Sequence, residues 1–235
     1  MSDIVLLDFG GTLDGDGVPW SLRFFAFYRE AGGRLPAREF EAAFRETDRA
    51  LARLPGVRIL GFRATIEVQA SLLAALLPPG SPDLRPVTER FYQDSLATVE
   101  RNRAVLAELR AAGHRLGVIA NFSGNLARCL DELGLTACFE TIADSGVVGV
   151  SKPDPRIFRA ALDALGGAGE DHCWMVGDNP DADIRPAIAL GCSTAWVAPR
   201  ARPLPPGLQP TVRLTSLAGL PDAIRDHERA DTRCG

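Results

Sequence analysis

The fold is decided by residues 4–13, which read IVLLDFGGTL. The first four are apolar and form a run too short for a helix, which is typical of a strand buried on both faces. The run ends at Asp8, and Gly10 and Gly11 then allow the backbone to turn tightly. We therefore expect Asp8 at the carboxyl end of a central strand, which is the edge of an open α/β sheet where ligands bind.

Outward from this stretch, the chain first becomes helical. A polar, glycine-rich hinge at residues 14–17 is followed by segments with apolar residues at helical spacing, separated by proline and glycine. We expect helices at residues 20–32, 37–54, 62–77 and 83–98. The pattern predicts a helical cap domain over residues 16–100, inserted after the first strand.

From residue 101 onward, helices and strands alternate. Strands are expected at residues 115–120, 139–143, 173–176, 193–197 and 211–214, with helices between them, for example 102–112, 155–165, 180–190 and 217–226. Repeated βα units indicate an α/β fold with a doubly wound, Rossmann-like parallel sheet. Residues 1–15 and 101–235 would form this core domain, and the tail from Glu228 is expected to fray.

Composition excludes several classes of protein. The net charge is −4 and there is no basic cluster, which argues against nucleic-acid binding. No apolar run is long enough to span a bilayer and no export signal is evident, so we expect a cytoplasmic protein. We expect a monomer or homodimer, without a sequence feature that decides between them. The five cysteines have no metal-ligand spacing and are expected to be free thiols.

Lysine is nearly absent from the chain. Of 26 basic residues, only Lys152 is a lysine, and the rest are arginines. A position that keeps lysine here indicates a need for a compact ammonium rather than a planar guanidinium.

Acidic and amide side chains follow three of the expected strands. These are Asp8, Asn121 and Asp178, and Asp183 lies at the start of the next helix. Because parallel strands end at one edge of a sheet, these carboxylates are expected to meet there, and oxygen ligands favour Mg²⁺. Lys152, in a loop that enters a helix, is expected to reach the same pocket and to balance its charge.

Four motifs in this order resemble the haloacid dehalogenase superfamily, specifically its branch of phosphatases with a small helical cap. The motifs are Asp8-Phe9-Gly10-Gly11-Thr12-Leu13, Ala120-Asn121, Lys152-Pro153-Asp154, and Gly177-Asp178 with Asp183.

The resemblance implies a hydrolase that cleaves a small phosphorylated substrate through an aspartyl-phosphate at Asp8, with Lys152 as a second catalytic group. Mg²⁺ would be held by Asp8, the Gly10 carbonyl, Asp178 and Asp183. Gly10, Gly11, Asn121 and Lys152 would bind the phosphate.

Two positions depart from the family pattern. Gly10 stands where the phosphatases carry a second aspartate that protonates the leaving group, and Ala120 stands where they carry serine or threonine. Asp14 or Asp16 is an alternative source of the acid, and Asn121 or Ser123 an alternative phosphate ligand.

These departures leave three readings open: a phosphatase with a reduced acid, a phosphoryl transferase of the same fold, and a non-catalytic protein that binds a phosphorylated ligand or partner. One further set of residues either lines the pocket mouth, which would favour an anionic and partly apolar substrate, or, as we expect, forms a solvated basic face: Trp20, Arg23, Phe24, Arg53, Arg58 and Arg63.

Overall fold

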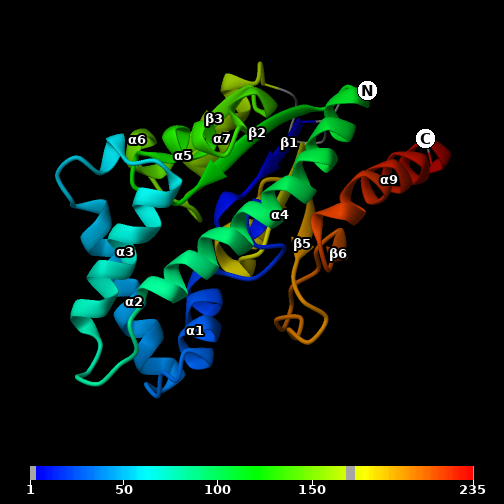
Figure 1. Ribbon diagram of the computed structural model, residues 1–235. Helices are drawn as coiled ribbons and strands as arrows, with labels where there is room; N and C mark the ends of the chain where they lie inside the picture. Colours follow the sequence, from blue (N-terminus) through cyan, green and yellow to red (C-terminus); the bar gives the residue numbers. More distant parts are fainter. Residues whose placement is uncertain (1–3, 168–172, 235) are drawn as a thin grey trace.

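The computed structural model describes residues 4–167 and 173–234, with side chains through residue 230. Its centre is a six-stranded sheet in which all neighbouring strands are parallel, in the order β3-β2-β1-β4-β5-β6 (Figure 1). The strands are β1 (Ile4–Leu7), β2 (Arg115–Ala120), β3 (Thr141–Asp144), β4 (Cys173–Gly177), β5 (Ser193–Val197) and β6 (Val212–Leu214). The predicted doubly wound α/β fold is confirmed.

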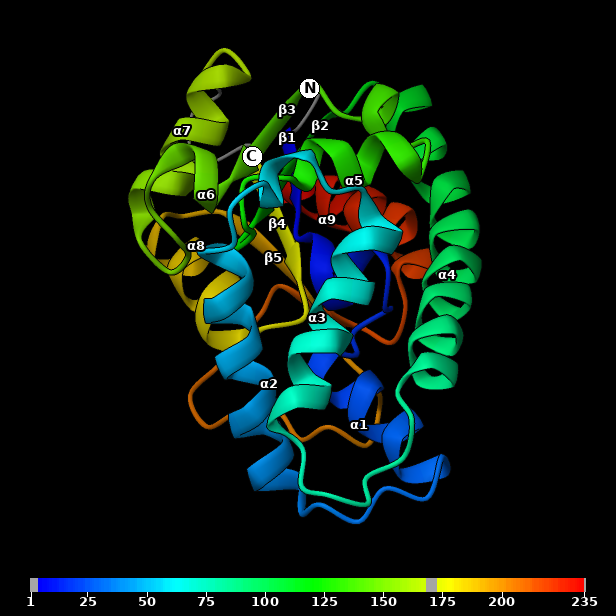
Figure 2. The ribbon, with the colours of Figure 1, turned by 60° about the vertical axis from the view of Figure 1, so that its left-hand side comes forward.

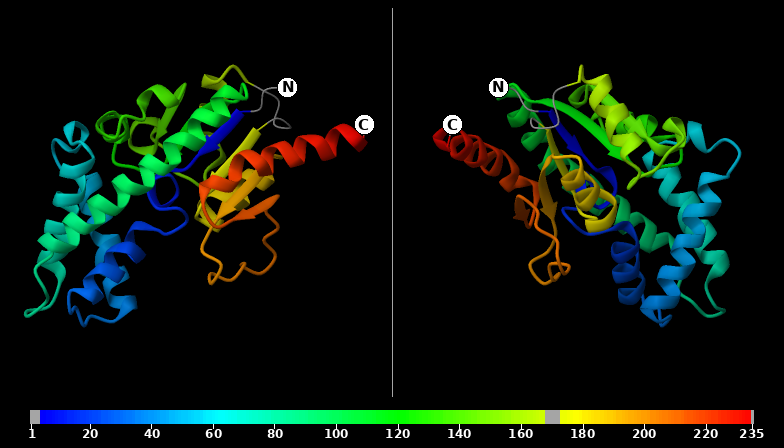
Figure 3. Two further views of the ribbon diagram at one scale, coloured as in Figure 1. Left: turned by 45° about the vertical axis from the view of Figure 1, so that its right-hand side comes forward. Right: turned by 180° about the vertical axis from the view of Figure 1, so that it is seen from behind.

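Helices cover both faces of this sheet and form an insertion between β1 and β2. The insertion contains α1 (Trp20–Glu30), α2 (Ala37–Ala52), α3 (Phe62–Leu76) and the first turns of α4 (Arg85–Ala111). The remaining helices are α5 (Leu126–Glu132), α6 (Ser145–Val148), α7 (Pro155–Ala164), α8 (Arg185–Ala189) and α9 (Leu220–Cys234). Figure 2 shows α2 and α3 side by side, and Figure 3 shows that the insertion lies beyond one end of the sheet.

The alternation of side chains along β1 divides the core into two halves. Val5 and Leu7 pack on the face covered by α4, α5 and α9, whereas Ile4 and Leu6 pack on the face covered by α7 and α8. All four side chains are buried. A run that is apolar at every position is therefore needed, because both faces of the central strand are covered.

The strand register brings the candidate residues together. Leu7 pairs with Val118 of β2 and with Val176 of β4, so β1 and β4 end within one residue of each other, and β2 continues two residues further, to Ala120. Asp8 continues this pairing, since its amide donates to the carbonyl of Val176 at 2.8 Å. The residues that follow the strands consequently meet at one edge.

Two predictions about helices are wrong. The pattern predicts two separate helices, at residues 83–98 and 102–112. The structure has one, since α4 runs without a break from Arg85 to Ala111, and no glycine or proline interrupts residues 87–111. The tail was expected to fray from Glu228, but α9 continues to Cys234. The division into a core domain and a cap domain at residues 15/16 and 100/101 stays a prediction.

The cysteine prediction is wrong for one pair. Cys173 at the start of β4 and Cys192 just before β5 form a disulfide, with their Cα atoms 5.1 Å apart. These strands are neighbours in the sheet, which places the two residues side by side although 19 positions separate them. Cys129 and Cys138 are free thiols, as predicted, and the side chain of Cys234 lies outside the described residues.

Over residues 4–167 and 173–234, no helix has the length and apolar character needed to cross a membrane.

Candidate active site

Lys152 is the centre of the site at the carboxyl edge of the sheet. Its side chain is buried, and its Nζ donates to Asp8 Oδ1 at 2.6 Å, to Asp183 Oδ1 at 2.7 Å and to the carbonyl of Ile119 at 2.9 Å. An ammonium has three N–H donors, so all of them are used. A planar guanidinium does not match this arrangement, which gives a physical reason for the lysine in a chain that otherwise uses arginine.

The loop that carries Lys152 is fixed by Asn121 at the end of β2. The Asn121 side chain accepts a hydrogen bond from the Lys152 amide at 2.7 Å and donates to the Lys152 carbonyl at 2.9 Å. Asn121 also lines the cavity described below. Its side chain therefore positions Lys152. The sequence predicts Asn121 only as a phosphate ligand and does not predict this contact with Lys152.

Three carboxylates surround this ammonium. Asp8, Asp178 and Asp183 are buried, and each offers an oxygen that lies within 4.8 Å of the others. Asp183 also accepts from the Asn179 amide at 3.0 Å, and Asp178 lies 3.5 Å from the Thr12 hydroxyl. The predicted convergence of Asp8, Lys152, Asp178 and Asp183 is thus present in the structure.

The electrostatics of the cluster follow from burial and crowding. Burial, together with repulsion from Asp8 and Asp183, raises the pKa of Asp178 well above its usual range. Burial also raises the pKa of Asp183, although Lys152 opposes the shift. For Lys152, burial lowers the pKa, but attraction to Asp183 and Asp8 outweighs it, so the lysine stays charged.

The donor set fits a hard divalent cation. Oδ2 of Asp8 is buried and has no hydrogen-bond partner among the described residues, and the three carboxylates outnumber the two cations of the described residues that pair with them, Lys152 and Arg202. Oxygen ligands with an excess of negative charge are what Mg²⁺ prefers. Asp8, Asp178 and Asp183, with the carbonyl of Gly10, are the groups that would hold such an ion.

One residue near the cluster has no sequence signal. Arg202, in the proline-rich loop after β5, donates to the Asp178 carbonyl at 2.9 Å and lies 3.8 Å from its Oδ2. Its guanidinium also lies over the ring of Trp196. Arg202 therefore partly offsets the charge of Asp178, and nothing in the spacing of the sequence predicts this contact.

Gly10 and Gly11 differ in their surroundings. Gly10 lines the cavity, as predicted. The Gly11 amide, by contrast, donates to Oδ1 of Asp14 at 2.7 Å, so the structure does not support the prediction that this amide faces a phosphate. Gly11 has a φ of +93°, and a Cβ there would lie 3.1 Å from the Asp178 carboxylate. It is needed for the close approach of the loop to Asp178.

Asp14 and Asp16 do not supply an acid to the site. The Asp14 carboxylate is fully buried and bonded to Gly11, Trp20, Arg23 and Ser95. Asp16 accepts from Asn102 and from the amide of Leu217. Neither lines the cavity that contains Asp8.

A cavity of about 530 Å³ connects the cluster to the helical insertion. Core residues on its wall include Asp8, Gly10, Ala120, Asn121, Ser123, Lys152, Asp178 and Asp183. The insertion contributes residues from α1, α2 and α3, among them Trp20, Glu41, Phe44, Arg45, Asp48, Arg49 and Gln69. The cavity can hold a small molecule with its reacting group at Asp8.

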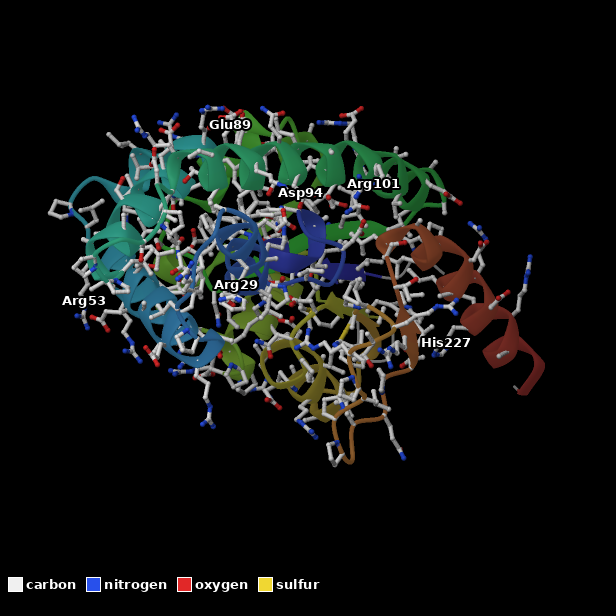
Figure 4. All side chains as sticks on the ribbon, turned by 60° about the horizontal axis from the view of Figure 1, so that its bottom comes forward. Arg29, Arg53, Glu89, Asp94, Arg101 and His227 are labelled. Atoms are coloured by element: carbon white, nitrogen blue, oxygen red, sulfur yellow. A yellow bond between two sulfur atoms is a disulfide. The ribbon has the colours of Figure 1, made fainter. Side chains whose placement is uncertain are left out.

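Of the residues considered for the pocket mouth, Trp20 lines the cavity and the other five do not, and Arg53, Arg58 and Arg63 are exposed, in agreement with the favoured solvated face. Arg23 and Phe24 are buried between helices, and Arg58 and Arg63 bond to Gly146 and to glutamates. Arg53 lies at the periphery of the insertion (Figure 4). The arginines on the cavity wall are Arg45 and Arg49, one turn apart on α2.

The sequence of this chain is similar to those of known hydrolases. The family described as haloacid dehalogenase-like hydrolase matches residues 3–191. A phosphoserine phosphatase of Thermus thermophilus is 38% identical over 142 residues, which are 59% of this chain and 57% of that protein. Pyrimidine 5'-nucleotidase YjjG of Escherichia coli is 34% identical over 48% of this chain and 51% of that protein. The chain thus spans just over half the length of these relatives.

Solved structures show the same fold. YfnB of Bacillus subtilis, bound to magnesium, superposes with a TM-score of 0.56 at 18% identity, over 93% of this chain and 96% of that one. The L-2-haloacid dehalogenase of Xanthobacter autotrophicus gives a TM-score of 0.58 at 21% identity, over 96% and 99%. Because the family match covers most of its length, the chain belongs to the haloacid dehalogenase-like hydrolases.

Proposed function

We propose that this chain is a Mg²⁺-dependent phosphatase that hydrolyses a small phosphorylated metabolite through an aspartyl-phosphate at Asp8. The observation that carries the proposal is the state of the Asp8 carboxylate on the cavity wall. Oδ1 is held by Lys152, whereas Oδ2 is buried without a partner among the described residues. A carboxylate that is fixed on one side and unpaired on the other is suited to nucleophilic attack.

The reaction takes place in two displacements. An oxygen of Asp8 forms a bond to phosphorus while the bond from phosphorus to the leaving-group oxygen breaks, and that oxygen takes a proton from solvent. Water then attacks the same phosphorus, the bond to Asp8 breaks, and inorganic phosphate leaves with the carboxylate restored. Lys152 is already in place beside Asp8, where it stabilises the negative charge of the phosphoryl oxygens without moving.

Mg²⁺ would be bound by Asp8, Asp178, Asp183 and the Gly10 carbonyl, and would neutralise phosphoryl charge. The three carboxylates, which outnumber the cations Lys152 and Arg202 that pair with them, support this assignment.

The relatives favour phosphate esters as substrates. Besides the two described above, they include a glyceraldehyde 3-phosphate phosphatase of Pyrococcus abyssi, 36% identical over 43% of this chain, and a phosphoglycolate phosphatase of Rhodospirillum rubrum, 42% identical over 37%. The dehalogenase structures share the fold at about 20% identity, which says nothing about the reaction.

The absence of a side chain at residue 10 limits the chemistry. General acid catalysis is worth roughly 10² to 10⁴ in rate, and neither Asp14 nor Asp16 reaches the cavity to supply it. We therefore expect a preference for leaving groups that need little protonation, such as aryl or acyl phosphates. The same gap favours a second candidate function, phosphoryl transfer, because without an aspartate at position 10 to activate water the aspartyl-phosphate survives longer.

The test is phosphate release from phenyl phosphate, acetyl phosphate and glycerol phosphate, with and without Mg²⁺, for the native chain and for Asp8→Asn. Release that requires both Mg²⁺ and Asp8 is expected. Mass spectrometry of acid-quenched protein would locate a phosphoryl group on Asp8. If Asp8 is phosphorylated, no inorganic phosphate is released, and an added acceptor alcohol is converted to its phosphate ester, the chain is a transferase. If neither release nor phosphorylation exceeds the Asp8→Asn control, the proposal is wrong.

A further inference from the structure

Asp14 is a fully buried carboxylate that joins three parts of the chain. Its Oδ1 accepts from the Gly11 amide at 2.7 Å, in the loop that follows the candidate nucleophile. Its Oδ2 accepts from Trp20 Nε1 at 2.7 Å, from Arg23 at 3.0 Å and from the Ser95 hydroxyl at 3.2 Å. The loop, α1 and α4 are therefore tied to one side chain.

The charge of Asp14 is balanced by Arg23. This guanidinium is buried, lies over the ring of Phe91 with its carbon 4.1 Å from the ring centre, and also bonds to Ser95 at 2.7 Å. Asp94, labelled on α4 in Figure 4, lies 2.9 Å from it and is half exposed. Breaking a buried pair of this kind by removing one partner is costly, so the network holds α1 against α4 and the loop.

This network fixes the position of the Trp20 side chain. Its indole packs edge-on against the rings of Phe9, Phe62 and Phe122, which restricts its rotation. A Cβ built on Gly10 would have Trp20 Nε1 as its nearest heavy atom, at 3.5 Å, and the next two atoms also belong to the indole. Trp20 thus faces the space beside Gly10, and both residues line the cavity with Asp8.

We infer that Trp20 is a specificity-determining residue that contacts the leaving group of the substrate, and that Asp14 is the positioning residue that holds its indole there. The inference rests on the proposed function. A leaving group bound on the Gly10 side of Asp8 meets an aromatic surface instead of an ionisable side chain. The ligand class that this surface favours is a phosphate ester with an apolar, planar leaving group, in preference to a polyol phosphate.

The kinetic test compares kcat/KM for phenyl phosphate with kcat/KM for glycerol phosphate. Trp20→Ala and Asp14→Asn are expected to lower this ratio at least about fivefold, with KM for phenyl phosphate rising more than kcat falls, as for a lost apolar contact. Trp20→Phe keeps the Asp14–Arg23 pair, and its ratio is expected to lie between the ratio of Trp20→Ala and that of the native chain. Asp16→Asn is the matched control, because Asp16 is in the same hinge but bonds to neither Trp20 nor Gly11.

A ratio that changes less than about twofold in Trp20→Ala would overturn the assignment of Trp20. Asp14→Asn removes a buried charge, so its folding is checked by circular dichroism. If it does not fold, Trp20→Phe and Trp20→Ala still decide the assignment of Trp20. Asp14→Glu then tests the role of Asp14, because it retains the negative charge but displaces the Trp20 indole, and it is expected to lower the same ratio of kcat/KM values.

A binding measurement separates this inference from the proposed function. In an Asp8→Asn background, which does not turn over, phenyl phosphate is titrated while tryptophan fluorescence is recorded. Trp20 lines the cavity, whereas Trp174 and Trp196 are buried in the sheet. Two results together would support the inference, even if no substrate is hydrolysed. Phenyl phosphate should quench the fluorescence of Asp8→Asn but not that of the double variant Asp8→Asn with Trp20→Phe. It should also bind at least about fivefold more tightly than inorganic phosphate. Binding without a Trp20 signal, or no binding, would overturn it.

Discussion

The ammonium of Lys152 lies 2.6 Å from Asp8 and 2.7 Å from Asp183, and so links the end of β1 to the segment after β4. All three side chains are buried, and no other lysine or arginine of the described residues forms an ion pair with Asp8 or Asp183. Lys152 consequently has two separable roles, in the stability of the fold and in the proposed chemistry.

Lys152→Met is expected to reduce both the stability of the fold and the rate of phosphate release. Removing one partner of a buried ion pair typically costs about 3 to 5 kcal/mol, because the remaining charges are left unbalanced. The free energy of unfolding in urea should fall by an amount of this order, and part of the loss should return when Mg²⁺ is added. Phosphate release should fall by more than about 100-fold.

Lys152→Arg serves as the comparison. It keeps the positive charge but not the three-directional ammonium, so it should recover much of the stability and little of the activity. Full activity in Lys152→Arg would contradict the role given to the ammonium geometry.

Binding of Mg²⁺ is expected to depend on the carboxylates at the strand ends. In titration calorimetry, Asp178→Asn and Asp183→Asn should each weaken Mg²⁺ binding by at least about tenfold, since each removes a charged oxygen ligand. Asp181→Asn is a matched control from the same segment, because Asp181 is exposed and paired with Arg185. Chelation by EDTA should abolish phosphate release in the native chain. Equal affinity in all three variants would place the ion elsewhere.

The sequence was sufficient for the sheet and for the convergence of four site residues. The continuous apolar runs of β1, β2 and β4, each followed by a polar residue, determine both the buried strands and the edge at which Asp8, Asn121 and Asp178 meet. Strand β5 begins and ends where the pattern predicts, at Ser193 and Val197. A continuous apolar run is a strong signal where both faces of a strand are buried.

The network around Asp14 could not be predicted in this way. Charged residues in a helical segment are usually exposed, whereas Arg23 is buried and bonds both to Asp14 in the loop before α1 and to Ser95 on α4. The same holds for Arg202, whose loop has no periodic pattern, and for Gly177, where a Cβ would lie 2.3 Å from Asp183 Oδ2. These features depend on how separate loops and helices pack against one another, which the local sequence pattern does not encode.

Cys129 is expected to resist alkylation in the native protein. Burial raises the pKa of its thiol from 9.0 to about 12, and a hydrogen bond with Thr65 offsets only part of this shift. A raised pKa lowers the thiolate fraction, so that at pH 8 about one molecule in 10⁴ is reactive instead of about one in ten. Iodoacetamide at pH 8 followed by peptide mass spectrometry should label the half-buried Cys138 first and Cys129 only after unfolding. Equal labelling of both thiols in the native state would contradict the burial of Cys129.

Gly10→Asp is expected to introduce the missing acid. The backbone of Gly10, at φ −76° and ψ 110°, is accessible to any residue, and the nearest atom to the new Cβ lies at an ordinary contact distance of 3.5 Å. An acid at this position should raise kcat for glycerol phosphate by about 10² and for phenyl phosphate by much less, because the phenolate leaves without protonation. Gly10→Asn is the matched control, because it adds a side chain of nearly the same size at the same backbone position but no acid. An equal gain for both esters, or none, would show that leaving-group protonation is not what limits the native chain.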